Sequence, residues 1–440
     1  MAIANDFEEF IENIAPDQLD AMNTSVKEIA KKLNNHYYNL KSDDTSHMYV
    51  VGSVGRGTSI KGASDLDIIF DLPTEKFTQY DNYGENSNGQ SALIQEVKNV
   101  LLERYPNTDI SGDGQVVVIA FAKYTVELVP GFKQSDNSFK YPDTNAGGTW
   151  KITNPLPEIE ESKNAAAESN NVFIHICNML REWKNNIGFK FGGLLIDTLT
   201  YNFLNSNTSY KSATFSDYLD IVKDIFSYLK GLNKEQSYWF ALGSNQHVYN
   251  SSNGNFIDKA KDAFEKLETL LDDNCNAILI EIFGNKFPKT TSSETTDYAL
   301  MEKQTERFIY QLFSVDIRYS LQIDCDVKSK IKAGNRTTDF SQSLRYMLSN
   351  RFALHTGKDL VFKIIKCDVP GGAESCDIYW KIKNNGQEAY DRDCFRGQIE
   401  KTNCTKHFER TDFKGNHYVE CFLVKNGICV AKDRIDVPIG

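Results

Sequence analysis

The sequence predicts an α+β protein that ends in a small all-β, sandwich-like domain. Residues 1–160 mix helical spacing of apolar residues with short strand-like runs, whereas residues 161–350 keep helical spacing almost throughout. Residues 355–440 consist of short strand-like runs separated by turn signals such as Asn-Gly. We therefore expect a mixed domain over 1–160, a helical domain over 161–350 and an all-β domain over 355–440.

Apolar side chains recur at helical spacing over residues 6–40, first at 7–14 and then at 19–33. Asp17 is a candidate cap for the second segment, which would place one long helix ahead of the first strand. An apolar strand follows at residues 48–51, and a second strand is expected at 64–70. Residues 91–105 return to helical spacing. The runs 115–122 and 124–130 are strand-like and form either a hairpin or one bent strand.

A glycine-rich turn separates the first two strands. The first strand stops at Gly52 and Ser53, and Gly55 and Gly57 follow at once, so the backbone is free to turn tightly and to approach a ligand closely. Backbone N–H groups in such a turn are suited to holding phosphate. The glycine spacing matches neither the dinucleotide-binding fingerprint nor the P-loop.

The strand after this turn carries two acids near its start, Asp65 and Asp67. Side chains alternate across a strand, so both carboxylates point to the same face. Neighbouring carboxylates repel each other unless a cation lies between them. Such oxygen ligands suit Mg²⁺, which also takes phosphate oxygens from nucleotides. A glycine turn or an Asp-x-Asp pair alone is common in ordinary turns and solvated strands, but together they indicate nucleotidyl transfer.

The stretch GSVGRGTSIKGASDLDIIFDL, residues 52–72, resembles the signature of the DNA polymerase β-like nucleotidyltransferases. Within that superfamily it most resembles the oligoadenylate synthetases and the bacterial cGAS/DncV-like enzymes. The resemblance implies a nucleotidyltransferase palm over the mixed domain and a helical domain that completes the active-site cleft. It also implies that Gly52 and Ser53 hold the triphosphate.

A third acid, Glu127, lies among apolar residues of the run VELVPGF. From its surroundings alone, an ion pair or an outward-facing edge position explains it equally well, because an unpaired buried carboxylate is costly. The run resembles the segment that carries the third catalytic acid of oligoadenylate synthetases, where an Asp stands in place of Glu127. The resemblance implies that Asp65, Asp67 and Glu127 are catalytic and hold two Mg²⁺ or Mn²⁺ ions.

Two basic residues lie on a helix predicted through Val172 and Trp183. In the related enzymes a Lys that contacts the triphosphate usually stands two residues before the Trp, and Arg181 takes that place here. The resemblance thus implies phosphate contacts from Arg181 and from Lys184, whereas helical spacing alone is equally consistent with exposed surface charges. The polar segment 238–248 has aromatic surroundings that suit an approach to a base.

Composition excludes several classes of protein. The chain of 440 residues has no apolar run of eighteen residues and carries a net charge of −11, so we expect neither a membrane span nor strong binding to duplex nucleic acid. Nine cysteines without regular spacing fit a reducing cytoplasm better than a disulfide framework.

The all-β domain carries the runs WKIKNNG, FRGQI and GNHYVECFLVKNGICVAKD. These resemble the C-terminal sensor domain that accompanies bacterial cyclases and cGAS/DncV-like enzymes. The resemblance implies a small-molecule, nucleotide-like ligand. Arg396 and Trp380 are candidate contacts for its phosphate and base, and a purely structural role for each is the alternative.

The resemblance implies an enzyme that condenses nucleoside triphosphates into a cyclic or linear oligonucleotide second messenger and releases pyrophosphate. The product would activate a separate effector in an anti-phage, CBASS-type system. Two alternatives stay open: a nucleotide-binding sensor or regulator with little turnover, and a nucleotidyltransferase that acts on RNA or another macromolecule. The acidity of the chain disfavours the RNA version.

Overall fold

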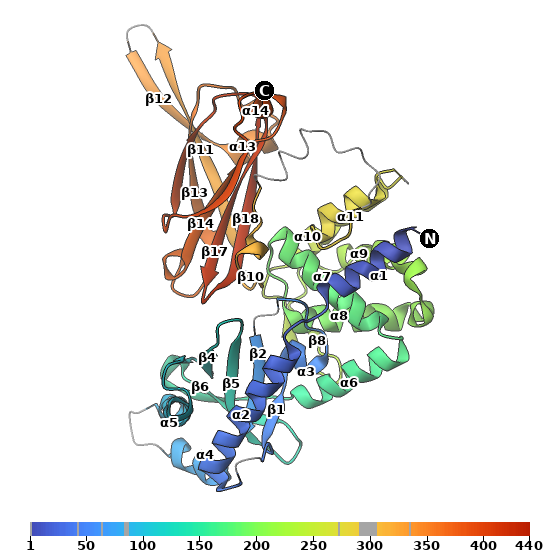
Figure 1. Ribbon diagram of the computed structural model, residues 1–440, viewed down its shortest axis with the longest axis vertical. Helices are drawn as coiled ribbons and strands as arrows, with labels where there is room; N and C mark the ends of the chain where they lie inside the picture. Colours follow the sequence, from blue (N-terminus) through green and yellow to red (C-terminus); the bar gives the residue numbers. More distant parts are fainter. Residues whose placement is uncertain are drawn as a thin grey trace. The chain divides into compact units, whose positions relative to one another are not determined.

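The fold is described from a computed structural model that covers residues 2–41, 44–62, 65–82, 88–271, 273–289, 306–333 and 336–440, with side chains outside 329–339. The chain divides into two compact units (Figure 1). The first comprises residues 1–183 and 191–289, and the second comprises residues 184–190 and 290–440. Within the described ranges, no helix is both long and apolar enough to cross a bilayer.

The first unit begins with a mixed α/β part, which we call the palm. Its elements are α1 (Ala2–Ile14), α2 (Leu19–Tyr38), β1 (Met48–Val50), α3 (Gly52–Arg56), β2 (Asp65–Asp71), α4 (Thr74–Asp81), α5 (Gly89–Arg104), β3 (Asp109–Asp113), β4 (Val116–Ala120), β5 (Thr125–Lys133), β6 (Phe139–Asp143) and β7 (Thr149–Thr153). The strands form one sheet with the order β1-β2-β5-β4-β3, and β6 and β7 extend from β5. β2 and β5 are parallel, whereas the other pairs are antiparallel.

One face of the palm sheet is covered by α2 and α5. Leu66 and Ile68 of β2 point to this face, together with Val126 and Leu128 of β5, and all four are completely buried. They pack against apolar residues of the two helices, including Leu33. Because side chains alternate along each strand, the residues between them point to the opposite face.

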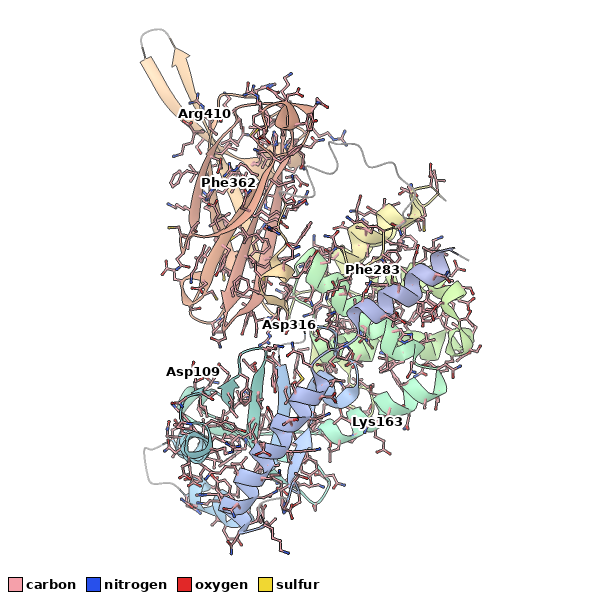
Figure 2. The ribbon with its side chains drawn as sticks, in the orientation of Figure 1. Asp109, Lys163, Phe283, Asp316, Phe362 and Arg410 are labelled. Carbon is pink, nitrogen blue, oxygen red and sulfur yellow. The ribbon has the colours of Figure 1, made fainter. Side chains whose placement is uncertain are left out.

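The rest of the first unit is helical. Its elements are α6 (Pro155–Glu168), α7 (Val172–Ile187), α8 (Gly193–Ser206), α9 (Tyr218–Lys230), β8 (Tyr238–Phe240), β9 (His247–Tyr249), α10 (Asn255–Glu268) and α11 (Cys275–Phe283). The N-terminal helix α1 packs here, because the ring of Phe10 lies 5.0 Å from that of Phe283 (labelled in Figure 2) and 5.1 Å from that of Phe287. α1 therefore belongs to the helical core, and α2 belongs to the palm.

The second unit is a sandwich of two sheets. Its elements are β10 (Ser314–Val315), β11 (Leu321–Ala333), β12 (Arg336–Ser343), α13 (Leu344–Ser349), β13 (Asp359–Cys367), β14 (Asp377–Lys383), α14 (Gln387–Asp391), β15 (Arg396–Lys401), β16 (Lys406–Arg410), β17 (Gly415–Lys425) and β18 (Ile428–Ile439). The strand orders are β10-β18-β17-β14-β15 and β12-β11-β13-β16. Phe362 (labelled in Figure 2) and Trp380 are each 1% exposed and belong to the core cluster of this unit.

The two helical segments expected within residues 6–40 are α1 and α2, on either side of Pro16, a residue that interrupts helical hydrogen bonding. The residue at the N-cap of α2 is Gln18, one position after the expected cap Asp17. The predicted end of the helical region was wrong. The expected helical region to residue 350 contains β10, β11 and β12, so the C-terminal β structure begins before residue 355. The palm and the helical part lie within one compact unit, so a functional boundary near residue 160 stays a prediction.

Candidate active site

The palm sheet brings the three predicted acids to one face. Asp65 and Asp67 are separated by one residue on β2, and Glu127 on the parallel neighbour β5 is in register with Asp67. All three side chains are half-buried. They point away from the face that α2 and α5 cover, because their neighbours Leu66 and Val126 belong to that core. Three carboxylates therefore share one face across two adjacent strands.

Asp65 has a defined partner on the neighbouring strand. The hydroxyl of Thr125, which is in register with Asp65, donates a hydrogen bond of 2.6 Å to Asp65 Oδ1. Thr125 is 5% exposed, so the bond is shielded from water. A hydrogen bond of this kind orients the carboxylate that accepts it.

The glycine-rich turn lies directly against Asp67. The N–H of Val51 donates to the carbonyl of Asp67 at 2.9 Å, and α3 starts at the next residue, Gly52. Gly52 has φ +62°, and a Cβ built on it would lie 1.8 Å from Asp67 Oδ2. Only glycine fits this position, because the backbone approaches the carboxylate in a left-handed conformation. The predicted residues Gly52 and Ser53 thus form the turn beside the acids.

The acid face offers carboxylate ligands for divalent cations. In the part of the chain that the structure describes, no three His, Cys, Asp or Glu side chains converge closely enough to hold a metal ion by themselves. Mg²⁺ in nucleotide sites is usually held by one or two carboxylates, with waters and phosphate oxygens as its other ligands. The donor set of Asp65, Asp67 and Glu127 suits that division, in which a nucleotide completes the coordination.

Arg181, a predicted phosphate contact, lies in a buried ion pair. It is 5% exposed, and its guanidinium donates to both carboxylate oxygens of Asp197, at 2.7 and 3.0 Å. A further bond of 3.1 Å goes to the carbonyl of Gly193. Bidentate pairing of this kind occupies the planar fork of an arginine. Arg181 therefore has a buried structural partner, and its contact with phosphate stays a prediction.

Lys184 is also engaged elsewhere. Its ammonium lies 2.9 Å from a carboxylate oxygen of Asp316 and 2.7 Å from the carbonyl oxygen of Ile317, and the residue is 7% exposed. Residues 184–190 belong to the second compact unit together with these partners. The prediction of Lys184 as a triphosphate contact is thus not supported, because burial and ion pairing hold its charge within that unit.

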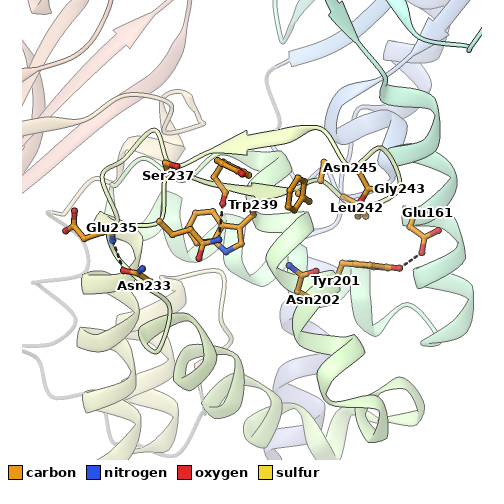
Figure 3. A pocket seen from close by; sticks show the side chains of 14 residues that line it. Glu161, Tyr201, Asn202, Asn233, Glu235, Ser237, Trp239, Leu242, Gly243 and Asn245 are labelled. Atoms are coloured by element: carbon orange, nitrogen blue, oxygen red, sulfur yellow. Dashed lines mark hydrogen bonds between the residues drawn. The ribbon is translucent and has the colours of Figure 1, made fainter.

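A pocket of about 850 Å³ lies beside the β8–β9 hairpin (Figure 3). This hairpin contains the polar segment 238–248, whose aromatic surroundings were expected to suit an approach to a base. Tyr201 and Asn202 of α8 line it together with Glu161 of α6, which accepts a hydrogen bond of 2.5 Å from the Tyr201 hydroxyl. Among the described lining residues there are carboxylates, of Glu161 and Glu235, but no Lys, Arg or His, and none of the three palm acids. The pocket is therefore poorly suited to a triphosphate.

Trp380 and Arg396 of the second unit have structural roles. The Trp380 indole N–H donates to the carbonyl of Cys404 at 2.9 Å, within the sandwich core. Arg396 donates to both carboxylate oxygens of Glu409, at 2.8 and 2.9 Å. Burial alone would raise the pKa of Glu409, but hydrogen bonds from His407 and Arg396 outweigh it and lower the pKa to about 2.

Several residues around the site were not foreseen. Thr125 orients Asp65. Asp197, the partner of Arg181, also accepts hydrogen bonds from Arg56 and Thr58. Arg56 and Thr58 belong to the motif at residues 52–72, and this position in the sequence indicates a role close to the site. Asp197 had only a weak signal, namely one acid in the otherwise apolar run GLLIDTL.

Two segments of the chain match known domain families. Residues 1–165 match the model of the Second Messenger Oligonucleotide or Dinucleotide Synthetase (SMODS) domain, and residues 303–440 match that of the Adenylyl/Guanylyl and SMODS C-terminal sensor domain. A curated relative, the cyclic AMP-AMP-AMP synthase of Acinetobacter sp., is 20% identical in an alignment of 269 residues that covers 58% of this chain and 76% of the relative.

Among solved structures, the chain is similar to E. coli MS115-1 CdnC with ATP, with a TM-score of 0.51 and 16% identity over 65% of this chain and 98% of that one. The same CdnC in complex with HORMA-deltaN gives a TM-score of 0.49 at the same identity and coverage. The first likeness shows a shared fold. The two domain matches give the chain a second-messenger synthetase domain over residues 1–165, followed by a C-terminal sensor domain over residues 303–440.

Proposed function

We propose that the protein condenses nucleoside triphosphates into a short cyclic or linear oligonucleotide and releases pyrophosphate. The observation that carries this proposal is the register of β2 and β5, which sets Glu127 beside Asp67 on the face that also bears Asp65. Gly52 holds the phosphate-binding turn against the same carboxylate. The acids and the turn are therefore parts of one site.

Each residue has a distinct role in this proposal. Asp65, Asp67 and Glu127 hold two Mg²⁺ or Mn²⁺ ions together with the phosphates of the nucleotide. Such ions lower the pKa of an attacking hydroxyl and stabilise charge on the leaving pyrophosphate. Thr125 keeps the Asp65 carboxylate in one orientation through its hydrogen bond. Ser53 and the backbone N–H groups at the start of α3 hold the β- and γ-phosphates.

The setting we propose follows from the family and from composition. The curated relative is named a cyclic AMP-AMP-AMP synthase, and we infer a product of the same chemical class, without assigning its bases, linkage or ring size. The product would act on a separate effector in anti-phage, CBASS-type signalling in the cytoplasm. The net charge of −11 supports nucleotides over duplex nucleic acid as partners.

We further propose that the C-terminal domain binds a small nucleotide-like ligand that alters synthesis. Support comes from the sensor-domain match over residues 303–440. A ligand regulates an enzyme only if it binds the active and inactive states with different affinity. The sandwich includes β11 and β12, so a truncation meant to remove this domain must begin before residue 303, well ahead of β13.

The central test is product synthesis by variants of the acids. Purified protein is incubated with all four labelled nucleoside triphosphates and either metal ion, and products are resolved before and after phosphatase treatment. Asp65→Asn, Asp67→Asn and Glu127→Gln are each expected to lower the rate roughly a thousandfold or more, since metal stabilisation contributes several kcal/mol. Glu127→Asp, which restores the acid usual in the related synthetases, is expected to keep activity.

Asp109→Asn is the matched control, because Asp109 is an exposed acid on β3 of the same sheet. It should behave as the wild-type protein does. Wild-type rates in the Asp67 variant would refute the assignment of the site. Phosphatase-resistant products support a cyclic or protected oligonucleotide, whereas label transferred to added RNA supports the macromolecular alternative. Nucleotide binding without any product supports the regulator.

A further inference from the structure

Two residues of the glycine-rich motif do not face a ligand. Arg56 ends α3 and is 7% exposed, and Thr58, two residues later, is completely buried. Arginine is rarely buried unless it is paired, so a charged partner must lie in the same interior. The part of the motif that reads Arg-Gly-Thr therefore has a role other than direct contact with phosphate.

That partner is Asp197 of α8. Its side chain is completely buried and accepts from Arg56 Nε at 2.8 Å and from the Thr58 hydroxyl at 3.0 Å. The same carboxylate accepts the two bonds from Arg181 of α7. One aspartate thus joins the end of α3 to two helices of the helical part. We call Arg56, Thr58, Arg181 and Asp197 the α3 anchor.

The charges of the α3 anchor favour an ionised aspartate. Burial alone would raise the pKa of Asp197, but the guanidinium groups of Arg181 and Arg56 outweigh it and hold the pKa below its usual value. Glu158 Oε2 lies 3.7 Å from Arg56 Nη1, and Glu158 Oε1 accepts a hydrogen bond of 2.9 Å from the Ser244 hydroxyl. Two acids thus balance two arginines in this interior.

The α3 anchor connects directly to the phosphate-binding turn. The N–H of Thr58 donates to the carbonyl of Ser53 at 2.9 Å, so the residue that Asp197 holds is also bonded to the start of α3. The carbonyl of Arg56 accepts a further bond of 2.6 Å from the Ser162 hydroxyl of α6. The helix is only five residues long, and an isolated helix of that length is not stable in water.

We propose that Asp197 is a positioning residue for nucleotidyl transfer. It touches no reacting atom; it fixes the end of α3, so that Gly52 and Ser53 keep their place beside Asp67. This inference rests on the proposed function for its effect on catalysis, but the ordering of α3 is independent of it. Arg181 acts from behind the aspartate, where its two bonds hold the carboxylate toward Arg56 and Thr58.

The test compares Asp197→Asn and the milder Thr58→Val with the control Glu182→Gln. Glu182 follows Arg181 on α7, is 6% exposed and pairs with Lys286 at 2.8 Å, so the control removes a similarly buried ion pair that does not touch α3. Hydrogen exchange of the amides at residues 53–57 is measured in the full-length protein, together with thermal unfolding, KM for nucleoside triphosphates and kcat.

Both anchor variants are expected to exchange these amides at least roughly tenfold faster, because a buried hydrogen bond to a charged group is lost. Their KM for nucleoside triphosphates should rise by a similar factor when all variants are compared at the same interval below their unfolding temperatures. Glu182→Gln should change neither the exchange rate nor KM. Thr58→Val keeps the experiment decisive if Asp197→Asn fails to fold. Unchanged exchange in Thr58→Val, or equal acceleration in Glu182→Gln, would overturn the proposal. If the anchor variants exchange faster but the wild-type protein has no synthase activity, the proposed function is wrong and the positioning of α3 by Asp197 still holds.

Discussion

At Gly52, the addition of a single methyl group is expected to lower catalysis strongly while it leaves the fold intact. Its φ of +62° lies in the left-handed region, and a Cβ there would lie 1.8 Å from Asp67 Oδ2, where ordinary contacts are 3.4–4 Å. The Gly52→Ala substitution therefore combines backbone strain with a direct clash. The clash falls on the carboxylate that we assign to the metal ions.

The magnitude follows from these two terms. A left-handed conformation costs a non-glycine residue about 1–2 kcal/mol, which a domain of this size tolerates. The clash requires the turn or the carboxylate to move by about 1.5 Å, and a misplacement of about 1 Å at a reacting centre costs on the order of a hundredfold in rate. We therefore expect Gly52→Ala to lose at least a hundredfold in kcat while its unfolding temperature falls by only a few degrees.

The matched control is Gly62→Ala. Gly62 has φ +78°, and no atom lies within 4 Å of a Cβ built there, so this change carries the strain without the clash. Pyrophosphate release and thermal unfolding are measured for both variants. If Gly52→Ala retains wild-type kcat, or loses no more activity than Gly62→Ala, then the turn does not set the position of Asp67 and the reasoning fails.

Two other predictions concern the C-terminal unit. The folded-state pKa of Glu409 is lowered to about 2, so its stabilising contribution is present above the ordinary value of about 4.3 and is lost as pH falls toward 2. The difference in unfolding temperature between wild type and Glu409→Gln should therefore shrink between about pH 5 and pH 2, and a constant difference would contradict the paired role of Arg396. For the sensor proposal, mono- and oligonucleotides added to the Asp67→Asn protein should slow hydrogen exchange within residues 303–440. Protection by duplex DNA or RNA in place of nucleotides would show that the domain is not a small-molecule sensor.

Local patterns predicted the parts of the site that depend on one strand. The alternation of side chains along β2 was sufficient to set Asp65 and Asp67 on one face, and the structure has them there. The pairing of Glu127 with Asp67 depends on the register between strands some sixty residues apart. No local periodicity encodes that register, so Glu127 was included only on the strength of the family resemblance.

The strand β11 was missed although its signal was present. Leu321, Ile323, Cys325 and Val327 are buried and alternate with polar residues, which is the period of a half-buried strand. The helical spacing of the preceding segment does not continue into this run, so the helical region ends before residue 321. The period of two in these residues predicts the strand.

Arg181 shows why residue type and spacing do not determine what a charge does. Its position two residues before Trp183 matched the phosphate contact of the related enzymes, but Asp197 lies sixteen residues further along the chain and reaches it only because α7 and α8 pack together. Without Arg181, the buried carboxylate of Asp197 would lose two of the hydrogen bonds that it accepts. The residues of the motif therefore have two different roles. Gly52 and Ser53 lie where a nucleotide is expected, whereas Arg56 and Thr58 fix the turn through Asp197, which lies outside the motif.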